Sequence, residues 1–228
     1  MKENTSRFHP RLEVLSEAQK SLWFNLQPCL KDGFVLYGGT AIALRLAHRP
    51  SVDFDFFNDK ALDKSALKDS IPLLEQAEVL QDSPNTWTLL IQQKEGYVKI
   101  SFFGGLTFGR IGEPEITIDN VLQVASLDDL MVMKLKVILQ RIEAKDYRDI
   151  AKMIKAGISI KKGLAGARAM FGPNFQPSEC LKALVYFEGG DLNSLTQDEK
   201  DTLINAAKAV RKLPQISIIS KKLSIEQT

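Results

Sequence analysis

The chain has 228 residues, of which 44% are hydrophobic and 25% are charged, and its net charge is +2. This composition is typical of a globular protein with one large or two small domains, and it argues against a strongly basic nucleic-acid scaffold. Two distant cysteines are expected to be reduced thiols, and two histidines make a His/Cys zinc site improbable. No run approaches the roughly 20 apolar residues of a membrane span and no signal stretch opens the chain, so we expect a cytoplasmic protein without a membrane partner.

The first part of the chain predicts alternating helices and strands. Apolar residues at helical spacing predict a helix from about residue 11 that Pro28 ends. A strand over 33–39 (GFVLYGG), a helix over 40–48 and a second strand over 51–57 (SVDFDFF) follow. A helix over 63–78, which Pro72 interrupts, then leads to two strands, 85–93 and 96–103, joined by a polar turn.

From residue 126 the pattern changes to long helical periods. Helices are predicted over 126–142, 144–156, 178–187 and 197–212. A boundary after the extended stretch 115–124 therefore predicts two domains, 1–125 with a sheet and 126–228 with helices.

Two aspartates alternate with aromatic residues in SVDFDFF. Because successive side chains of a strand point to opposite faces, Val52, Phe54 and Phe56 should enter the core while Ser51, Asp53 and Asp55 share the other face. Two carboxylates this close repel, so a proton or a cation must compensate. Oxygen ligands favour Mg²⁺ or Mn²⁺ as the cofactor, although a solvated strand face is the commoner meaning of such a pattern.

The paired glycines Gly38 and Gly39 join a strand to a helix. A helix that begins with glycine offers bare backbone N–H groups to a phosphate, and Thr40 could cap the helix or contact that phosphate. An ordinary tight turn would also use glycine. The Walker lysine and the G-x-G-x-x-G spacing are both missing, which excludes the P-loop and Rossmann interpretations.

The combination of strand, GG[ST], helix and D-x-D resembles the DNA polymerase beta-like nucleotidyltransferase superfamily. More narrowly, residues 36–57 resemble the AbiEii/AbiGii and MenT-type toxin nucleotidyltransferases, whose pattern places a basic residue and a serine, here Arg49 and Ser51, before the aspartates. The resemblance implies an α+β fold, with a nucleotidyltransferase-like mixed sheet flanked by helices and a C-terminal helical domain that closes the active cleft.

A second segment, 126–150, resembles the family's K-L…R…K-D-x-x-D region. Helical periodicity alone predicts that one lysine, Lys134, lies within the apolar stripe while Lys136 faces solvent. A buried lysine needs an anion, either an aspartate or a triphosphate, unless its side chain extends to solvent at the end of the stripe. The full stripe comprises Leu127, Leu130, Met131, Lys134 and Ile138 with Arg141 at its edge, and Asp129, Met133, Lys136, Gln140 and Glu143 lie opposite.

Asp146 and Asp149 lie three residues apart and should be neighbours on one helix flank, where Lys145 could pair with Asp149. A solvated ion-pair surface would explain the pattern equally well. The resemblance implies instead that Lys134 and Asp146 act in catalysis and that Arg141, Lys145 and Asp149 contact the nucleotide.

One position departs from the superfamily pattern. A third carboxylate is expected on the strand 96–103, where Tyr97, Lys99, Ser101 and Phe103 share a face and Ser101 takes the acidic position. Asp146 or Asp149 could substitute, a single metal could bind, or the protein could bind nucleotide without turnover.

The resemblance implies transfer of a nucleotide from a nucleoside triphosphate to an acceptor, which in the toxin relatives is the 3′ end of tRNA. Asp53 and Asp55 would hold Mg²⁺, and Gly38, Gly39, Thr40, Arg49 and Ser51 would contact the nucleotide. A cognate antitoxin is an expected partner, and basic residues between 152 and 168 could contact RNA. A catalytically silent binding protein and an antibiotic-modifying transferase remain the alternatives.

Overall fold

The computed structural model describes residues 6–225. Two compact units divide the chain. Unit 1 contains the residues up to Gly109, Glu113–Ser126 and the segment from Ser220, and unit 2 contains Arg110–Gly112 and Leu127–Ile219. The domain boundary at residue 125 that we inferred from the sequence stays a prediction. The units differ from it in two short segments, because Arg110–Gly112 belong to unit 2 and the segment from Ser220 belongs to unit 1.

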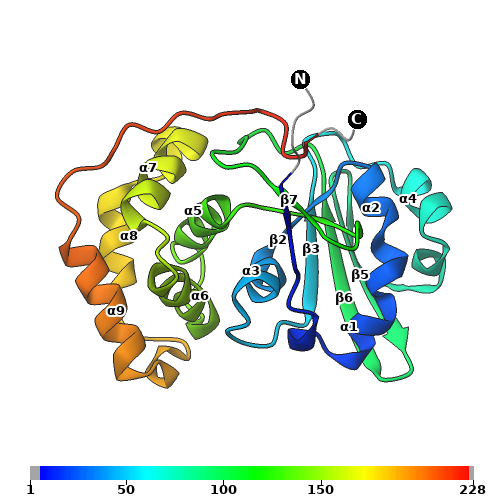
Figure 1. Cartoon of the computed structure of the whole chain (residues 1–228), viewed down its shortest axis with the longest axis horizontal. Coiled ribbons are helices and arrows are strands. Elements are labelled where there is room, and N and C mark those ends of the chain that lie inside the picture. The colour runs from blue at the N-terminus through cyan, green and yellow to red at the C-terminus, as the bar shows by residue number, and fades with distance from the viewer. Residues whose placement is uncertain (1–5, 226–228) are drawn as a thin grey trace. The chain divides into compact units, whose positions relative to one another are not determined.

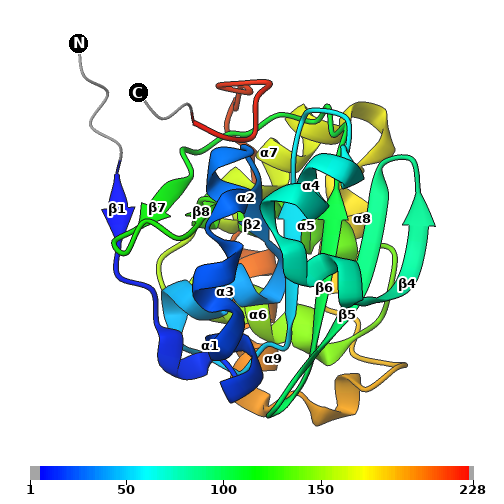
Figure 2. The same cartoon turned by 90° about the vertical axis from the view of Figure 1, so that its right-hand side faces the viewer.

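Unit 1 is built on one mixed sheet. The described residues form eight strands in the order β1-β7-β8-β2-β3-β6-β5-β4 (Figure 2). The central strand β3 pairs in parallel with β6 and antiparallel with β2, so the predicted mixed sheet is confirmed. The strands are β1 (Arg7–Phe8), β2 (Val35–Tyr37), β3 (Asp53–Phe57), β4 (Glu78–Ser83), β5 (Thr86–Gln93), β6 (Gly96–Phe103), β7 (Glu115–Thr117) and β8 (Gln123–Val124).

Helices cover both faces of this sheet, with α3 on one side and α1, α2 and α4 on the other (Figure 1). Their bounds are α1 (Glu17–Leu22), α2 (Pro28–Lys31), α3 (Gly38–Leu46) and α4 (Lys64–Ser70). The single helix predicted from residue 11 is wrong, because a 3-10 turn at Trp23–Leu26 separates α1 from α2. Pro28 begins α2 instead of ending a helix, since the first turn of a helix does not use the backbone N–H that proline lacks.

The core of unit 1 contains a cluster of aromatic side chains from three strands. Phe54 and Phe56 of β3 are fully buried, and the Phe56 ring lies 5.4 Å from that of Phe102 on β6. Trp87 of β5 extends the cluster, with its ring 6.1 Å from Phe102. Val52 was predicted to share this buried face, but it precedes β3 and is exposed. Because Phe54 and Phe56 point into the core, Asp53 and Asp55 lie on the opposite face of β3.

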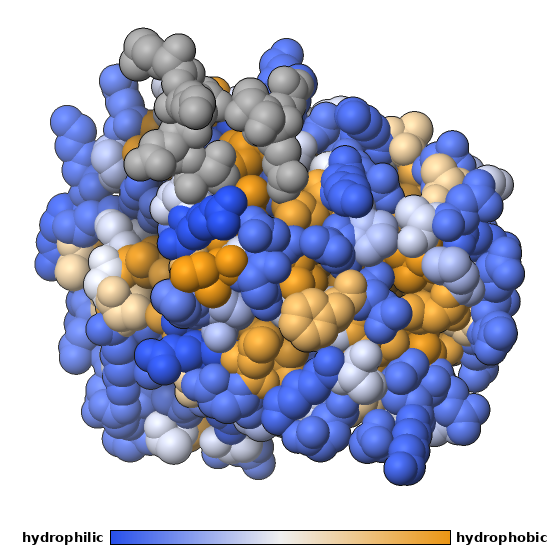
Figure 3. Space-filling view, turned by 45° about the vertical axis from the view of Figure 1, so that its right-hand side comes forward, coloured by the Kyte–Doolittle hydropathy of each residue, from blue (hydrophilic) through white to orange (hydrophobic). Residues whose placement is uncertain are grey.

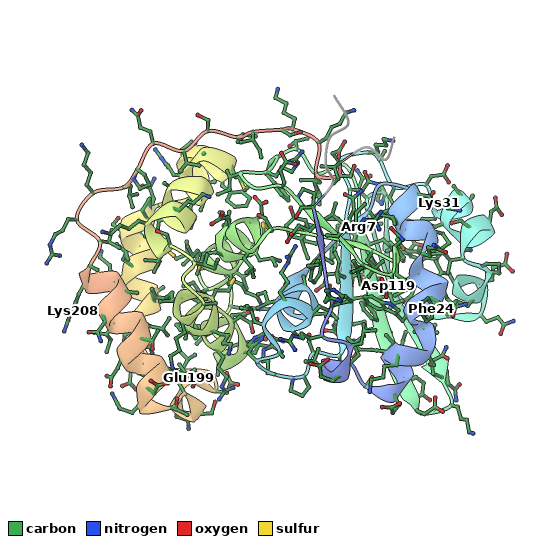
Figure 4. All side chains as sticks on the ribbon, in the orientation of Figure 1. Arg7, Phe24, Lys31, Asp119, Glu199 and Lys208 are labelled. Atoms are coloured by element: carbon green, nitrogen blue, oxygen red, sulfur yellow. The ribbon has the colours of Figure 1, made fainter. Side chains whose placement is uncertain are left out.

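Unit 2 is helical. Its helices are α5 (Leu127–Val137), α6 (Ala144–Lys155), α7 (Ile160–Phe171), α8 (Pro177–Leu184) and α9 (Gln197–Lys208). Helix α5 packs against α6 and α7, and α9 packs against α6 and α8. The last helix carries an acid near its start and a base near its end, Glu199 and Lys208 in Figure 4, which suits the direction of the helix dipole.

The sequence did not predict α7, because Gly163 and Gly166 lower helix propensity. The same glycines explain why the helix packs there. A Cβ atom at Gly163 would lie 2.5 Å from Cγ of Met131, and one at Gly166 would lie 2.5 Å from Cδ1 of Ile111. Close packing against α5 and Ile111 therefore outweighs the local propensity of this segment.

Several large apolar side chains remain at the surface of unit 1. Phe24, in the 3-10 turn after α1, is the most exposed of them (Figure 4), and Val79 and Leu80 lie on the edge strand β4. Figure 3 shows hydrophobic side chains lying among a majority of hydrophilic ones on the face that it draws. Single exposed apolar residues are ordinary on protein surfaces and do not by themselves indicate a partner.

Within residues 6–225, no helix combines the length and the hydropathy that crossing a membrane would require.

Candidate functional site

The paired glycines form the start of α3, directly after β2. Gly38 has a φ of +75°, and a side chain there would overlap Oδ2 of Asp55 and lie 3.3 Å from its Cγ. A Cβ atom at Gly39 would lie 2.6 Å from Nη2 of Arg49 and 3.1 Å from Oγ of Ser51. The absence of two side chains thus allows a carboxylate, a guanidinium and a hydroxyl to approach the first turn of one helix.

The two aspartates share one face of β3, as predicted. Phe54 and Phe56 are buried, whereas Asp53 and Asp55 are only partly buried. Asp55 lies opposite Tyr37 of β2 in the antiparallel pairing, which places it next to the glycine turn. The tight turn and the strand are therefore parts of one local arrangement, and both belong to unit 1.

Thr40 has a different role from the expected one. Helix α3 begins two residues earlier, with Tyr37 at its N-cap position, so the prediction that Thr40 caps the helix is wrong. Its side chain is buried and donates a hydrogen bond to the carbonyl oxygen of Asp53. This bond ties the first turn of α3 to the aspartate strand, and the proposed contact of Thr40 with a phosphate stays a prediction.

The sequence interpretation assigned no role to Lys99, but in the structure Lys99 forms an ion pair with Asp53. The parallel register of β3 and β6 sets Asp53 opposite Lys99 and Asp55 opposite Ser101. Nζ of Lys99 lies 2.9 Å from Oδ2 of Asp53, and the two side chains are 39% and 32% exposed. Alternation along β6 had predicted that Lys99 and Ser101 share one face of that strand. The sequence did not show which residues of β3 lie opposite them, because that depends on the register between the two strands.

Ser101 occupies the position beside Asp55 that was expected to carry a third acid. Its side chain is buried and accepts a hydrogen bond of 3.3 Å from Oγ1 of Thr88 on the next strand. The two β6 residues opposite the aspartates are thus a lysine and a serine. In the part of the chain that the structure describes, no group of three or more His, Cys, Asp or Glu side chains is arranged around a metal position.

The donor set of β3 still suits one Mg²⁺ or Mn²⁺ ion. Asp53 and Asp55 supply hard carboxylate oxygens from one strand face. Mg²⁺ is commonly bound by one or two carboxylates, together with water and the phosphates of a substrate. Two carboxylates on one strand face therefore fit a single divalent ion.

A buried ion-pair network connects α5 and α6 of unit 2. Lys134 of α5 is only 7% exposed, and its Nζ lies 2.7 Å from Oδ1 of Asp146 and 2.7 Å from Oδ2 of Asp149 on α6. The prediction that Lys134 needs an anion is confirmed, and the structure supplies two. Arg141 adds a second cation, with Nε 2.8 Å from Oδ2 of Asp146.

The two cations hold Asp146 in its charged form. Burial alone would raise the pKa of Asp146, but hydrogen bonds from Arg141 and the charge of Lys134 outweigh that effect, so its pKa lies below the ordinary value. The network of Lys134, Arg141, Asp146 and Asp149 joins α5 to α6.

One predicted ion pair and one predicted helix face in this region are wrong. Lys145 pairs with Glu143, at 2.6 Å, and not with Asp149, because Asp149 turns towards Lys134. Asp129 was placed on the polar face of its helix, yet it is buried and accepts backbone N–H bonds from Ile111 and Gly112. That segment of chain is distant in the sequence, so helical periodicity could not reveal the contact.

The basic residues suggested as an RNA surface are largely engaged within unit 2. Lys155 pairs with Asp198, and Lys162 pairs with Asp128 at 2.6 Å. Arg168 donates to the carbonyl oxygens of two residues near the end of its helix. These contacts give three of the five residues a structural role, and the RNA contact of the set Lys152, Lys155, Lys161, Lys162 and Arg168 stays a prediction.

Comparison with known proteins identifies related sequences. The sequence model of the family described as "Nucleotidyl transferase AbiEii toxin, Type IV TA system" matches residues 22–176. An uncharacterized protein of Aquifex aeolicus (strain VF5) is 33% identical over 160 residues, which cover 69% of this chain and 75% of that protein. The family match includes the glycine turn, β3 and the ion-pair network of α5 and α6.

Proposed function

We propose a nucleotide-transfer reaction from the premise that this chain belongs to the AbiEii family of nucleotidyl transferase toxins of type IV toxin–antitoxin systems. The family membership confirms the resemblance noted in residues 36–57. One observation supports a retained nucleotide site above all. Gly38 and Gly39 bring the first turn of α3 against Asp55 and Arg49, so a turn that suits a phosphate lies beside the carboxylate strand.

In the proposed reaction, a hydroxyl of the acceptor attacks the α-phosphorus of a nucleoside triphosphate. A new phosphorus–oxygen bond forms, the bond to the bridging oxygen breaks, and pyrophosphate leaves while the hydroxyl proton passes to water. The residues of unit 1 would bind and orient the triphosphate. Backbone N–H groups at Gly38 and Gly39 suit its phosphates, and Arg49 and Ser51 add a charge and a hydroxyl at the same turn.

Asp53 and Asp55 would hold the divalent cation, Mg²⁺ or Mn²⁺. When bound, such an ion neutralises charge that develops on the phosphates during displacement. The proposal needs both carboxylates to lie on one face of β3, and the burial of Phe54 and Phe56 on the opposite face favours this arrangement.

The residues of unit 2 have a proposed positioning role. Lys134 is already neutralised by Asp146 and Asp149, so its first effect is to hold α5 and α6 together. Arg141 and Lys145 keep nearly half of their side chains exposed, and their contact with a nucleotide stays a prediction. Direct catalysis by Lys134 or Asp146 stays a prediction.

The acceptor is proposed to be RNA, with the 3′ end of tRNA as the specific candidate. The family implies a cognate antitoxin as a partner of the system. One observation favours the alternative of nucleotide binding without turnover. The β6 residues opposite the two aspartates are Lys99 and Ser101, so neither adds a carboxylate.

A transfer assay tests the proposal. The protein is incubated with each α-labelled nucleoside triphosphate and Mg²⁺, with tRNA, with other RNA or with no added acceptor. We expect label on the tRNA, and we expect Asp53→Asn and Asp55→Asn to abolish it while the exposed Asp69→Asn does not. Nucleotide binding by calorimetry without any transfer would support the silent alternative.

A further inference from the structure

The proposed site contains a cation of its own. Lys99 lies opposite Asp53 in the β3–β6 register, and its ammonium group contacts the carboxylate at 2.9 Å. Both side chains keep about a third of their surface exposed, so the pair lies at the accessible face of the sheet. A lysine with a flexible four-carbon stem and three donors can move from one anion to another at such a position.

The neighbouring positions provide too few ligands for two divalent ions. A pair of ions about 4 Å apart is normally bridged and flanked by several carboxylates. Here β3 supplies Asp53 and Asp55, and the β6 residues opposite them are Lys99 and the buried Ser101, whose hydroxyl is bonded to Thr88. A second ion at Asp53 would also lie close to the ammonium group, which would repel it.

We propose that Lys99 takes the place of a second divalent ion. The site then holds one ion with its nucleotide, and the ammonium of Lys99 supplies the other positive charge. In the free protein the ammonium group of Lys99 pairs with Asp53, and in the nucleotide complex it contacts the triphosphate instead. This inference rests on the proposed function, since it concerns the same strand face.

The proposal predicts two effects of opposite sign for the loss of the ammonium group. Without nucleotide, Lys99 competes with a metal ion for Asp53, so its removal strengthens metal binding. With nucleotide present, Lys99 contacts phosphate oxygens, so its removal weakens nucleotide binding. If Lys99 only supported the strand, its removal would weaken the binding of the metal ion and of the nucleotide alike. Opposite effects on the two affinities therefore distinguish a role of the charge from a structural role.

The experiment compares Lys99→Met with Lys94→Met, an exposed lysine in the turn between β5 and β6. Binding of Mn²⁺ is measured by electron paramagnetic resonance, alone and with the α,β-methylene analogues of ATP, CTP, GTP and UTP. We expect Lys99→Met to bind Mn²⁺ alone roughly twofold to fivefold more tightly, the range that a partly exposed ion pair allows. Its affinity for the analogue at saturating Mn²⁺ should fall by at least about tenfold.

Stoichiometry gives the second measurement. The wild-type protein and Lys99→Met should each bind one Mn²⁺ in the presence of the analogue. Lys99→Asp places a third carboxylate opposite Asp53 and removes the repelling charge, so its stoichiometry should rise to two. Thermal unfolding of each variant establishes that the proteins compared are folded.

Two Mn²⁺ ions in the wild-type complex would overturn the inference, and so would unchanged or weaker Mn²⁺ binding by folded Lys99→Met. These results are independent of the transfer assay. Transfer to RNA together with two bound ions would refute the role of Lys99 and leave the proposed function intact. Tighter Mn²⁺ binding by Lys99→Met without any transfer would retain the role of Lys99 at the metal position and refute the proposed function.

Discussion

Gly38 and Asp55 are in direct contact, and the contact exists only because Gly38 has no side chain. The glycine begins α3 at a φ of +75°, and Oδ2 of Asp55 occupies the space that a Cβ atom would need. The pairing of β2 with β3 places Tyr37 opposite Asp55, which keeps the carboxylate at this turn. The glycine pair therefore determines how close Asp55 lies to the first turn of α3.

Replacing Gly38 by alanine should displace Asp55 and weaken the proposed metal site. We expect Gly38→Ala to reduce the affinity for Mn²⁺ by about tenfold, and the left-handed backbone adds a cost of about 1–2 kcal/mol to folding. Gly157→Ala is the matched control, because its φ is +89° and no atom lies within 4 Å of the added Cβ. Electron paramagnetic resonance and urea unfolding measure both quantities. Equal Mn²⁺ affinity in the two variants would contradict the role of the contact.

Lys134 and Lys136 lie two residues apart on α5 but should differ strongly in their effect on stability. Lys134→Met leaves Asp146 and Asp149 buried with one cation fewer, which should lower the free energy of unfolding by about 3–5 kcal/mol. Lys136 donates to the carbonyl oxygen of Asn174 at an exposed site and lies over the Phe171 ring, so Lys136→Met should cost only about 1 kcal/mol. Urea unfolding of both variants decides the matter, and similar costs would mean that the buried network contributes little.

The stability of the Lys134 variant decides what a loss of its activity means. A Lys134 variant that loses activity and stability together would not establish catalysis. A variant that keeps its stability and loses nucleotide binding would support the contact that the family resemblance implies.

Asp146 should make stability depend on pH in the acid range. Its pKa is lowered in the folded protein, so its contribution is fully present above the unfolded value of about 3.9 and is lost as the pH falls through the lower folded value. Asp146→Asn should therefore be less stable than wild type at pH 7, by about 3 kcal/mol, and the difference should shrink below about pH 4.

Asp201→Asn serves as the control for this series, because Asp201 is exposed and its carboxylate accepts a surface hydrogen bond from Gln197. Thermal unfolding from pH 7 to pH 2.5 gives the profile of each protein. A difference between wild type and Asp146→Asn that stays constant over this range would show that Asp146 is not held in its charged form by Arg141 and Lys134.

The local pattern of the sequence was sufficient to predict the parts of the site that lie close together in the chain. Alternation in SVDFDFF placed Asp53 and Asp55 on one face, and the buried Phe54 and Phe56 confirm it. Helical periodicity placed Lys134 within a buried stripe and required an anion there. These features depend on the period of a strand or helix, which a sequence displays directly.

Only the tertiary structure decided which groups meet across elements. The contact of Lys99 with Asp53 depends on the parallel register of β3 and β6, and two further strands lie between them in the sequence. The burial of Asp129 depends on a distant backbone segment, and the helix α7 depends on close packing at its glycines. Periodicity assigns a side chain to a face, but ion pairs and close contacts act over a few ångströms, so their partners are determined by how distant segments pack.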